Sequence, residues 1–345
     1  MIFEREGREG REGREGCVHE RRRSRHGKGR FIPFGALARW LGAGSSGPSR
    51  PSRLSRPSRL LIIAIIAGAA CRKTPAVTAS LSVVDDAGDT VRLAAPARRV
   101  VSLIPASTEL LFAIGAESAV VGRTSYCDYP ADARAVPDLG DGIKPNIEAI
   151  IASRPDLVVL YNSGQNAAVA ARLRELDIAA LRINTDALNS VPRVAHILGK
   201  LTGHESAADS LSAVFDTALT SATQPRATRR PKVLLLVWEQ PPMTIGRGSF
   251  LSELVERAGG ENLFADVASS SGVVSIEAVA ARDPDLIFTT VEGPSSFASR
   301  PEWQVVPAVR KHRFLHVSGS EFNRPSPRSP QAIRELSAKL NEAGP

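Results

Sequence analysis

Short apolar runs and amphipathic segments alternate along the chain from about residue 98 to residue 342. The short runs are rich in Val, Leu and Ile and end at turn residues, as buried strands do. They predict strands at 99–104, 120–122, 157–160, 180–184, 232–238, 286–290 and 314–317, after a hairpin at 83–93. Apolar residues at helical spacing predict helices at 105–115, 166–176, 190–201, 250–258 and 330–342. Strands that alternate with helices favour α/β layers with parallel sheets.

A longer amphipathic segment lies at 203–219, near the middle of this alternation. Gly203 suits the left-handed end of a preceding helix, and Glu205 favours the positive end of a new one. The new helix would run for about 17–20 residues, or roughly 25–30 Å. It is either a spacer between two lobes or a surface helix of one α/β domain.

An internal repeat favours the spacer. The pattern Ile-Glu-Ala, then Ala, then Pro-Asp-Leu occurs at 147–157 and again at 276–286, which is 129 residues later. Each copy predicts a short helix, a turn and a buried strand, so each half of the chain contains an equivalent unit. We therefore expect two Rossmann-like α/β lobes with parallel central sheets, joined by one long helix. A ligand would lie in the cleft between them, at the carboxyl ends of the strands. The predicted segments are 1–70, 71–202, 203–230 and 231–345.

The charge of the chain is concentrated in its first 70 residues. The whole chain has a formal net charge of +8, but residues 1–70 contribute +9 and the remainder −1. The folded part is nearly neutral, so it lacks the basic surface that nucleic-acid binding requires. The Arg-Glu-Gly repeat at 5–16 and the basic Ser/Pro/Arg stretch at 49–59 predict a disordered tail.

An apolar run of 11 residues at 60–70 precedes Cys71. This length is too short for a membrane-spanning helix and suits the core of a signal peptide. Small residues before Cys71 resemble a lipoprotein cleavage site, although Gly68 stands where a Leu-like residue is usual. We expect a periplasmic or cell-envelope protein with lipid attached at Cys71. Ordinary cleavage and a retained short anchor are the alternatives.

Common catalytic and metal-binding motifs are missing from the sequence. There is no Gly-x-Ser-x-Gly, Walker, Gly-x-Gly-x-x-Gly or His-Glu-x-x-His motif. After Cys71 only Cys127 remains, and His312 and His316 fall on a predicted strand, about 13 Å apart. The Gly246–Ser249 loop could hold an anion or be a plain turn. We predict neither catalytic residues nor a bound metal.

Aromatic and cationic residues collect at the predicted strand-to-helix loops. Aromatic faces in a cleft suit a large flat ligand, and an arginine suits an anionic group on it. Some of these rings are expected to fill the core of their own lobe, Tyr129 beside Pro130 first among them. The residues are Tyr126, Tyr129, Tyr161, Trp238, Phe322 and Arg324.

Several motifs together resemble a known family. They include 98–110, the loop 124–130, both Ile-Glu-Ala units, Gly-Gly-Glu-Asn at 259–262 and 324–328. The match covers roughly residues 98–342 and resembles the cobalamin-binding proteins of bacterial ABC importers, within the wider family that also binds ferric siderophores and haem. The resemblance implies two α/β lobes joined by a rigid helix, small lobe movement on binding, and no enzymatic activity.

The resemblance also implies roles for particular residues. Ligand contacts are implied for Tyr126, Tyr161, Trp238, Phe322 and Arg324. Glu148 and Glu277 match the two lobe-surface glutamates that pair with arginines on the importer's transmembrane subunits. Equivalent acids on two lobes suit docking onto a two-fold permease, although each also favours a helix N-terminus.

The sequence departs from the family in three places. Gly142 and Ser271 stand near positions where the cobalamin binders have tryptophans, and Asn323 replaces an acidic residue before the family's arginine. A more open cleft is expected, and the ligand stays open among corrinoids, ferric siderophores and haem. For haem, Tyr126 or Tyr161 could supply an axial ligand.

The expected partners are the transmembrane subunits of an ABC importer and a corrinoid ligand, with no nucleic acid and with membrane contact only through the lipid. The protein is expected to be a monomer without a cofactor. Two other classes stay open: a two-lobed metal-cluster enzyme, which the lone Cys127 disfavours, and a structural envelope lipoprotein.

Overall fold

The computed structural model describes residues 80–225, 229–289 and 296–343. The chain separates into two units, 1–70 and 71–345, and all described residues belong to the second. The expectations about the basic tail, the signal peptide and the lipid at Cys71 therefore lie outside the described residues. Within those residues, no helix has both the length and the apolar character needed to cross a membrane.

The first sheet has four parallel strands in the order β4-β3-β5-β6. Its strands are β3 (Val100–Ser102), β4 (Val120–Arg123), β5 (Leu157–Tyr161) and β6 (Ala179–Ile183). The helices of this lobe are α1 (Pro105–Ala113), α2 (Ile147–Ala152), α3 (Gly164–Arg174) and α4 (Ser190–Thr202), with 3-10 turns η1 (Glu117–Ala119) and η2 (Ala131–Ala135). The predicted hairpin is present as the antiparallel pair β1 (Leu81–Val84) and β2 (Thr90–Leu93).

The second sheet is mixed rather than wholly parallel, in the order β10-β8-β7-β11-β12, with β9 paired to β7. Its strands are β7 (Lys232–Glu239), β8 (Pro242–Ile245), β9 (Glu261–Asn262), β10 (Ser271–Val273), β11 (Leu286–Thr289) and β12 (Phe314–His316). The core strands β7, β11 and β12 run parallel as predicted, whereas β8 and β10 add an antiparallel edge.

Helices and 3-10 turns complete the second lobe. They are α6 (Phe250–Arg257), α7 (Ile276–Arg282), η3 (Ser296–Ser299), η4 (Pro301–Val305), α8 (Pro307–Arg310), η5 (Ser320–Phe322) and α9 (Ser329–Ala343). Both lobes therefore have the strand–helix alternation that the sequence predicts.

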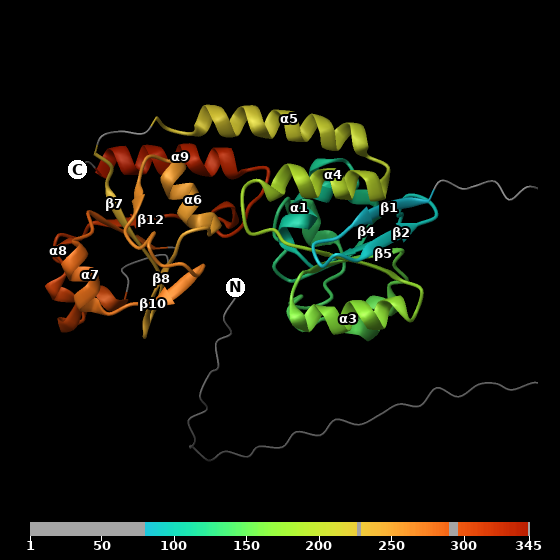
Figure 1. Ribbon diagram of the computed structural model, residues 1–345, viewed down its shortest axis with the longest axis horizontal. Helices are drawn as coiled ribbons and strands as arrows, with labels where there is room; N and C mark the ends of the chain where they lie inside the picture. The colour runs from blue at the N-terminus through green and yellow to red at the C-terminus, as the bar shows by residue number, and fades with distance from the viewer. Residues whose placement is uncertain (1–79, 226–228, 290–295, 344–345) are drawn as a thin grey trace, which may run out of the picture. The chain divides into compact units, whose positions relative to one another are not determined.

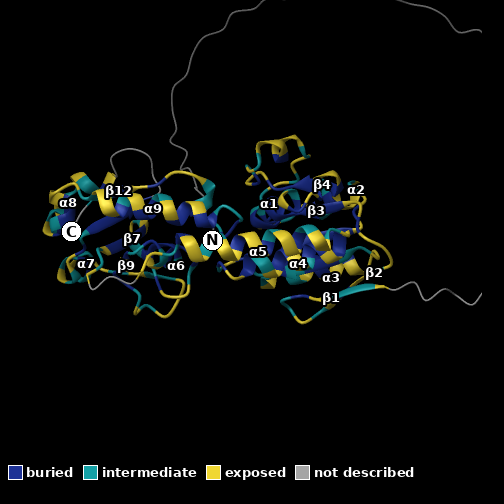
Figure 2. Cartoon of the chain, turned by 90° about the horizontal axis from the view of Figure 1, so that it is seen from above, coloured by how far each residue is buried: buried dark blue, intermediate teal, exposed yellow. Residues whose placement is uncertain are grey.

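The joining helix α5 (Glu205–Ala222) confirms the spacer interpretation. Gly203 is the left-handed C-cap of α4, with φ of 77°, so the chain turns directly from α4 into α5. Helix α5 contacts α4 of the first lobe and α9 of the second (Figure 1). Buried and exposed residues alternate along α4 and α5, as amphipathic helices require (Figure 2). Among the described residues, the chain passes from the first sheet to the second once, through this helix.

The repeated Ile-Glu-Ala segments form equivalent units. The side chains of Asn146 and Ser275 cap α2 and α7 by accepting hydrogen bonds from the amides of Ala149 and Ala278. Each helix leads into a buried strand, β5 or β11, in the middle of its sheet. The repeat therefore reports a real equivalence between the lobes.

Buried side chains alternate between the two faces of each sheet. Val100, Leu157 and Val159 belong to one apolar cluster, whereas Val101, Val158 and Leu160 belong to another on the opposite face. The first of these clusters continues through Phe215 of α5 into Val233 and Leu336 of the second lobe. Because the apolar core runs along α5 without a break, bending the two lobes apart would expose it. This supports the expectation of small lobe movement.

Candidate ligand-binding site

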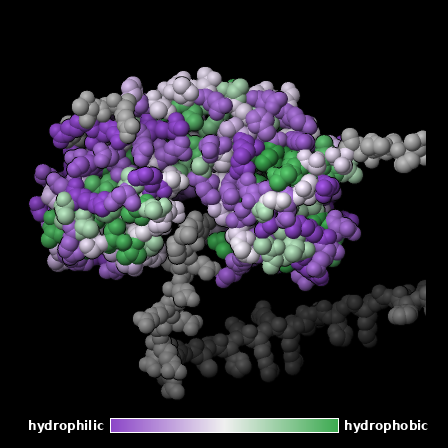
Figure 3. All heavy atoms as spheres, viewed as in Figure 1, coloured by the Kyte–Doolittle hydropathy of each residue, from purple (hydrophilic) through white to green (hydrophobic). Residues whose placement is uncertain are grey.

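Three of the sequence-predicted aromatic residues lie exposed near strand ends. Tyr161 is the last residue of β5, Trp238 lies near the end of β7, and Tyr126 follows β4. Their exposed fractions lie between 38% and 43%, so part of each side chain is accessible to solvent. The carboxyl ends of parallel strands are where open α/β sheets bind ligands. On the face drawn in Figure 3, hydrophobic patches lie on both lobes within a largely hydrophilic surface.

The buried side chain of Cys127 holds the loop that carries Tyr126 in place. The Cys127 thiol is fully buried, 3.1 Å from the hydroxyl of Thr108 on α1 and 3.3 Å from that of Thr124. The amide of Ser125 donates to the carbonyl of Gly140 at 2.9 Å. Cys127 thus anchors the loop to α1, and the residues on either side of it can project outward.

The Tyr161 hydroxyl donates a hydrogen bond of 2.7 Å to Asp186. Burial and the adjacent carboxylate raise the pKa of Tyr161 to about 12. The phenol therefore stays protonated at neutral pH. A phenolate is the form of tyrosine that binds ferric haem, so this environment disfavours Tyr161 as an axial ligand. The Trp238 indole donates to the carbonyl of Gln240 at 2.8 Å, which helps to orient its ring.

Phe322 and Tyr129 differ from what the sequence suggests. Phe322, in η5, is 2% exposed and packs in the main apolar cluster, so its ring fills the core. Its contact with a ligand stays a prediction, and it would require the core to open. The expectation that Tyr129 fills the core is wrong. Tyr129 is among the exposed large side chains, and the guanidinium of Arg328 lies 3.9 Å from its ring centroid.

Arg324 belongs to an ion cluster that joins the lobes. Its guanidinium donates to Glu109 on α1 at 2.7 Å and also to Asp128 in the Tyr126 loop. Arg328 donates to both carboxylate oxygens of Glu109, at 3.0 and 3.1 Å, and to Glu321. Glu109 and Asp128 belong to the first lobe, and the other three residues to the second. We call these five side chains the interlobe ion cluster.

The ion pairs of the cluster shift the pKa values of Asp128 and Arg328. Burial raises the pKa of Asp128, but the hydrogen bond and charge of Arg324 outweigh it, and the net pKa lies below the ordinary 3.8. For Arg328, burial lowers the pKa, but its contacts with Glu109 and Glu321 outweigh that effect and raise it. The side chain of Glu109 is only 1% exposed, so its charge depends on the two arginines for stabilisation.

Glu109 belongs to helix α1, which begins at Pro105 with Ile104 as its N-cap. Glu109 therefore lies inside the helix, on its buried face. The sequence signal for this burial was a glutamate within the buried face of a predicted helix.

Gly142 and Ser271, which stand near the positions of the family's tryptophans, have different structural surroundings. Gly142 is buried, with φ of 78°, and an added Cβ would lie 2.7 Å from the carbonyl oxygen of Leu103 and from a methyl group of Thr124. A side chain is excluded there by backbone conformation and by space. Ser271 lies half-buried on the edge strand β10, where no such limit applies.

We expect Gly142→Ala to lower the free energy of unfolding by about 2–3 kcal/mol, because it combines positive-φ strain with a backbone clash. Gly88→Ala is the matched control. Gly88 also has a positive φ, 85°, but an added Cβ meets nothing within 4 Å, so a loss of only about 1 kcal/mol is expected. Urea unfolding of both variants measures the difference, and equal losses would contradict the clash.

The two predicted docking glutamates have matching positions. Glu148 and Glu277 are exposed second residues of α2 and α7. Hydrogen bonds from its own backbone amide and from Ser275 lower the pKa of Glu277. Both therefore present a carboxylate to solvent at a helix N-terminus, one on each lobe. This position fits docking onto a permease and also fits stabilisation of the helix N-terminus.

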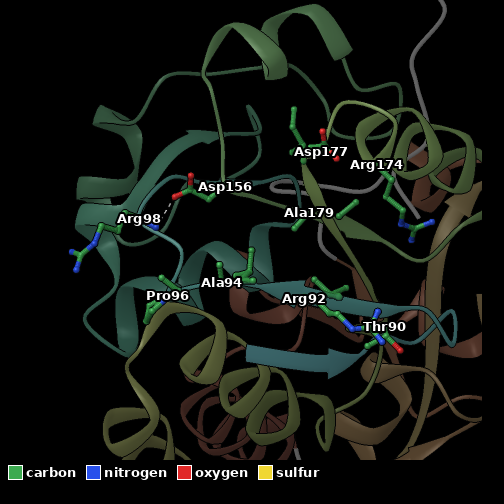
Figure 4. A pocket seen from close by; sticks show the side chains of 14 residues that line it. Thr90, Arg92, Ala94, Pro96, Arg98, Asp156, Arg174, Asp177 and Ala179 are labelled. Carbon is green, nitrogen blue, oxygen red and sulfur yellow. Dashed lines mark hydrogen bonds between the residues drawn. The ribbon is translucent and has the colours of Figure 1, made fainter. Parts of the chain in front are cut away.

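A cavity of about 610 Å³ lies elsewhere, in the first lobe between β2 and the start of β6 (Figure 4). In this cavity the backbone amide of Arg98 donates to Asp156 at 2.9 Å. Arg174, which also lines it, pairs with Asp89. None of the predicted ligand residues lines this cavity, so it is distinct from the predicted cleft.

The remaining candidate residues have local structural roles. The Ser249 hydroxyl caps α6 by accepting from the amide of Ser252, which fits a plain helix start. His316 lies on β12 and contacts the Thr289 hydroxyl at 2.8 Å. Across the described parts of the chain, no three His, Cys, Asp or Glu side chains are grouped as metal ligands would be.

Two α/β lobes, one joining helix and exposed aromatic residues at the strand ends define a two-lobed binding protein of the helix-joined type. The chain belongs to the periplasmic binding protein family, whose model matches residues 100–319. This confirms the resemblance noted in the sequence.

Individual relatives and structures agree with the family. The chain is 29% identical over 245 residues to a vitamin B12-binding protein of Vibrio parahaemolyticus, covering 70% of this chain and 88% of the relative. It is 28% identical over 270 residues to the ABC transporter substrate-binding lipoprotein YvrC of Bacillus subtilis, covering 74% and 84%. The crystal structure of the vitamin B12-binding protein BtuF of Vibrio cholerae matches with a TM-score of 0.63 and 27% identity, covering 72% of this chain and 98% of that one.

Proposed function

We propose that this protein is the substrate-binding protein of an ABC importer, and that it captures cobalamin or a related corrinoid between its lobes. The observation that carries the proposal is the exposure of Tyr126, Tyr161 and Trp238 near the ends of strands from both lobes. Large aromatic faces on two sides bind a broad macrocycle by burying apolar area and by stacking. The vitamin B12-binding relatives support the choice of a corrinoid.

The same proposal covers location and partners. The protein would act in the periplasm or cell envelope, anchored by lipid at Cys71, and deliver its ligand to the transmembrane subunits through Glu148 and Glu277. The lipoprotein relative and the family's periplasmic placement support this. It would act as a monomer and perform no catalysis. The ligand would be cargo, without metal ligation by the protein.

Ferric siderophores and haem are the alternative ligands. The raised pKa of Tyr161, about 12, makes its phenolate harder to form and so weighs against haem ligated by that residue. A metal-cluster enzyme has less support, because the Cys127 thiol is buried and lies within hydrogen-bonding distance of two threonine hydroxyls.

Calorimetric titration with cyanocobalamin tests the proposal. We expect micromolar or tighter binding, and Trp238→Ala is expected to weaken it about 10- to 100-fold through the loss of a large aromatic contact. Val214→Ala, on the exposed face of α5, is the control and should bind as the unmodified protein does. The absence of heat with cyanocobalamin, together with binding of haem or a ferric siderophore, would overturn the corrinoid assignment.

A further inference from the structure

We propose that the interlobe ion cluster makes the cleft select neutral ligands over anionic ones, with Asp128 as the residue that sets this preference. The proposal rests on the proposed function in one respect, that the ligand binds beside the Tyr126 loop. It reverses the simplest interpretation of Arg324, in which a single arginine receives an anionic group of the ligand.

Arg324 is already engaged by the protein. Its Nε donates to Glu109 and its Nη2 to Asp128, while only 15% of its side chain is exposed. Arg328 is equally covered, and it donates to Glu109, to Glu321 and, at 2.9 Å, to the Ser320 hydroxyl. A ligand anion would have to displace one of these carboxylates before it could reach either guanidinium.

The cluster has a formal net charge of −1, because three carboxylates surround two guanidiniums. The three carboxylates of the cluster are not equally exposed to solvent. Glu109 has 1% of its side chain exposed and Glu321 has 20%, whereas Asp128 has 42%. The group that an approaching ligand meets is therefore a carboxylate, with the cations behind it.

Asp128 is also close to the proposed ligand surface. It lies two residues after Tyr126, and its amide donates to the Tyr126 carbonyl at 3.1 Å. The buried Cys127 between them fixes the loop, so the aromatic ring and the carboxylate are held on one short turn. The pKa of Asp128 lies below 3.8 under the influence of Arg324, which keeps the carboxylate charged at neutral pH.

The chemistry of the preferred ligand follows. A carboxylate that retains free lone pairs can accept hydrogen bonds from amide N–H groups, and it repels carboxylates. The primary amides on the rim of a corrinoid are suitable donors. The propionates of haem and the carboxylates of acidic siderophores are disfavoured.

Two matched ligand pairs test the charge preference. The first is cyanocobalamin and its monocarboxylates, in which one peripheral amide has been hydrolysed, each isomer being measured separately. The second is haemin and its dimethyl ester. In each pair the macrocycle is the same and the charge differs. We expect the neutral member of each pair to bind about tenfold more tightly than the anionic member. For the corrinoid pair, the comparison uses the monocarboxylate isomer whose affinity differs most from that of cyanocobalamin.

Asp128→Asn should reduce this ratio about tenfold, because the cluster becomes neutral while the side chain keeps its shape. Glu321→Gln also removes one negative charge from the cluster, and it replaces Asp128→Asn in the test if that variant folds poorly. Asp266→Asn is the control, since Asp266 also pairs with an arginine, Arg282, outside the cluster. Its ratio should equal that of the unmodified protein.

The outcomes separate the two proposals. Binding of the haem ester over haemin, without binding of any corrinoid, would overturn the corrinoid assignment and support the charge preference. Tighter binding of the anionic member of either pair, or a ratio that Asp128→Asn leaves unchanged, would overturn the charge preference. Binding of neither macrocycle would overturn both.

Discussion

Glu109→Ala is expected to lower the free energy of unfolding by about 3–5 kcal/mol, because it leaves two largely buried guanidiniums without their shared carboxylate. Glu109 accepts one hydrogen bond from Arg324 and two from Arg328. Removing one partner of a buried ion pair costs far more than removing an exposed one, since the remaining charge stays desolvated. For a chain of this size the melting temperature should fall by roughly 10 °C.

Differential scanning calorimetry measures this loss, and Glu175→Ala is the control. Glu175 also pairs with an arginine, Arg172, but both residues lie at the end of helix α3, and both side chains are more than half exposed. The control should lose less than about 1 kcal/mol. A loss from Glu109→Ala as small as that of the control would show that the cluster does not hold the lobes together.

The double variant Glu109→Ala, Arg328→Ala isolates the pair itself. If the cost of Glu109→Ala comes mainly from the hydrogen bonds that the buried Arg328 guanidinium loses, adding Arg328→Ala should recover part of it. The two sites also belong to different lobes, so the coupling energy measures how strongly one lobe stabilises the other. A purely additive result would place the cost in lost packing instead.

The alternation of strands and helices could be predicted from the sequence because each element has a strong local signal. Buried parallel strands such as β5 and β7 are continuous apolar runs, and α5 has a long amphipathic period bounded by Gly203. The strands β8 and β10 were missed because they are short and form the antiparallel side of the sheet. Pro242 also resembles a loop residue, although the first position of a strand accepts proline.

The site could be predicted only in part. Aromatic residues at strand ends are visible in the sequence, since a strand and its following loop are local features. The setting of Tyr129 was missed, because its ring contacts Arg328, a residue of the other lobe that lies far away in the sequence. Glu109 and Arg324 are 215 residues apart, and no local pattern predicts that such residues pair. The domain boundaries at 202 and 230 stay predictions.

Reversing both docking charges, in Glu148→Arg with Glu277→Arg, is expected to reduce ligand uptake at least about 100-fold while ligand binding is retained. Each arginine would face an arginine of the importer, and such like-charge contacts cost several kcal/mol. Both glutamates are exposed residues at helix N-termini, so the substitutions themselves should change the stability of the fold little. The measurement is uptake of radiolabelled cyanocobalamin by cells that rely on this protein.

Glu117→Arg with Glu302→Arg provides a matched control. These exposed glutamates lie in the first turns of the 3-10 helices η1 and η4, one on each lobe, so the control makes the same charge change at comparable positions. Uptake by the control should stay near that of the unmodified protein, and either docking variant made singly should fall between the two. Because α5 and the continuous core hold the lobes together, both glutamates would engage at once, and the double loss should exceed either single loss. Normal uptake by the double variant would show that docking uses another surface.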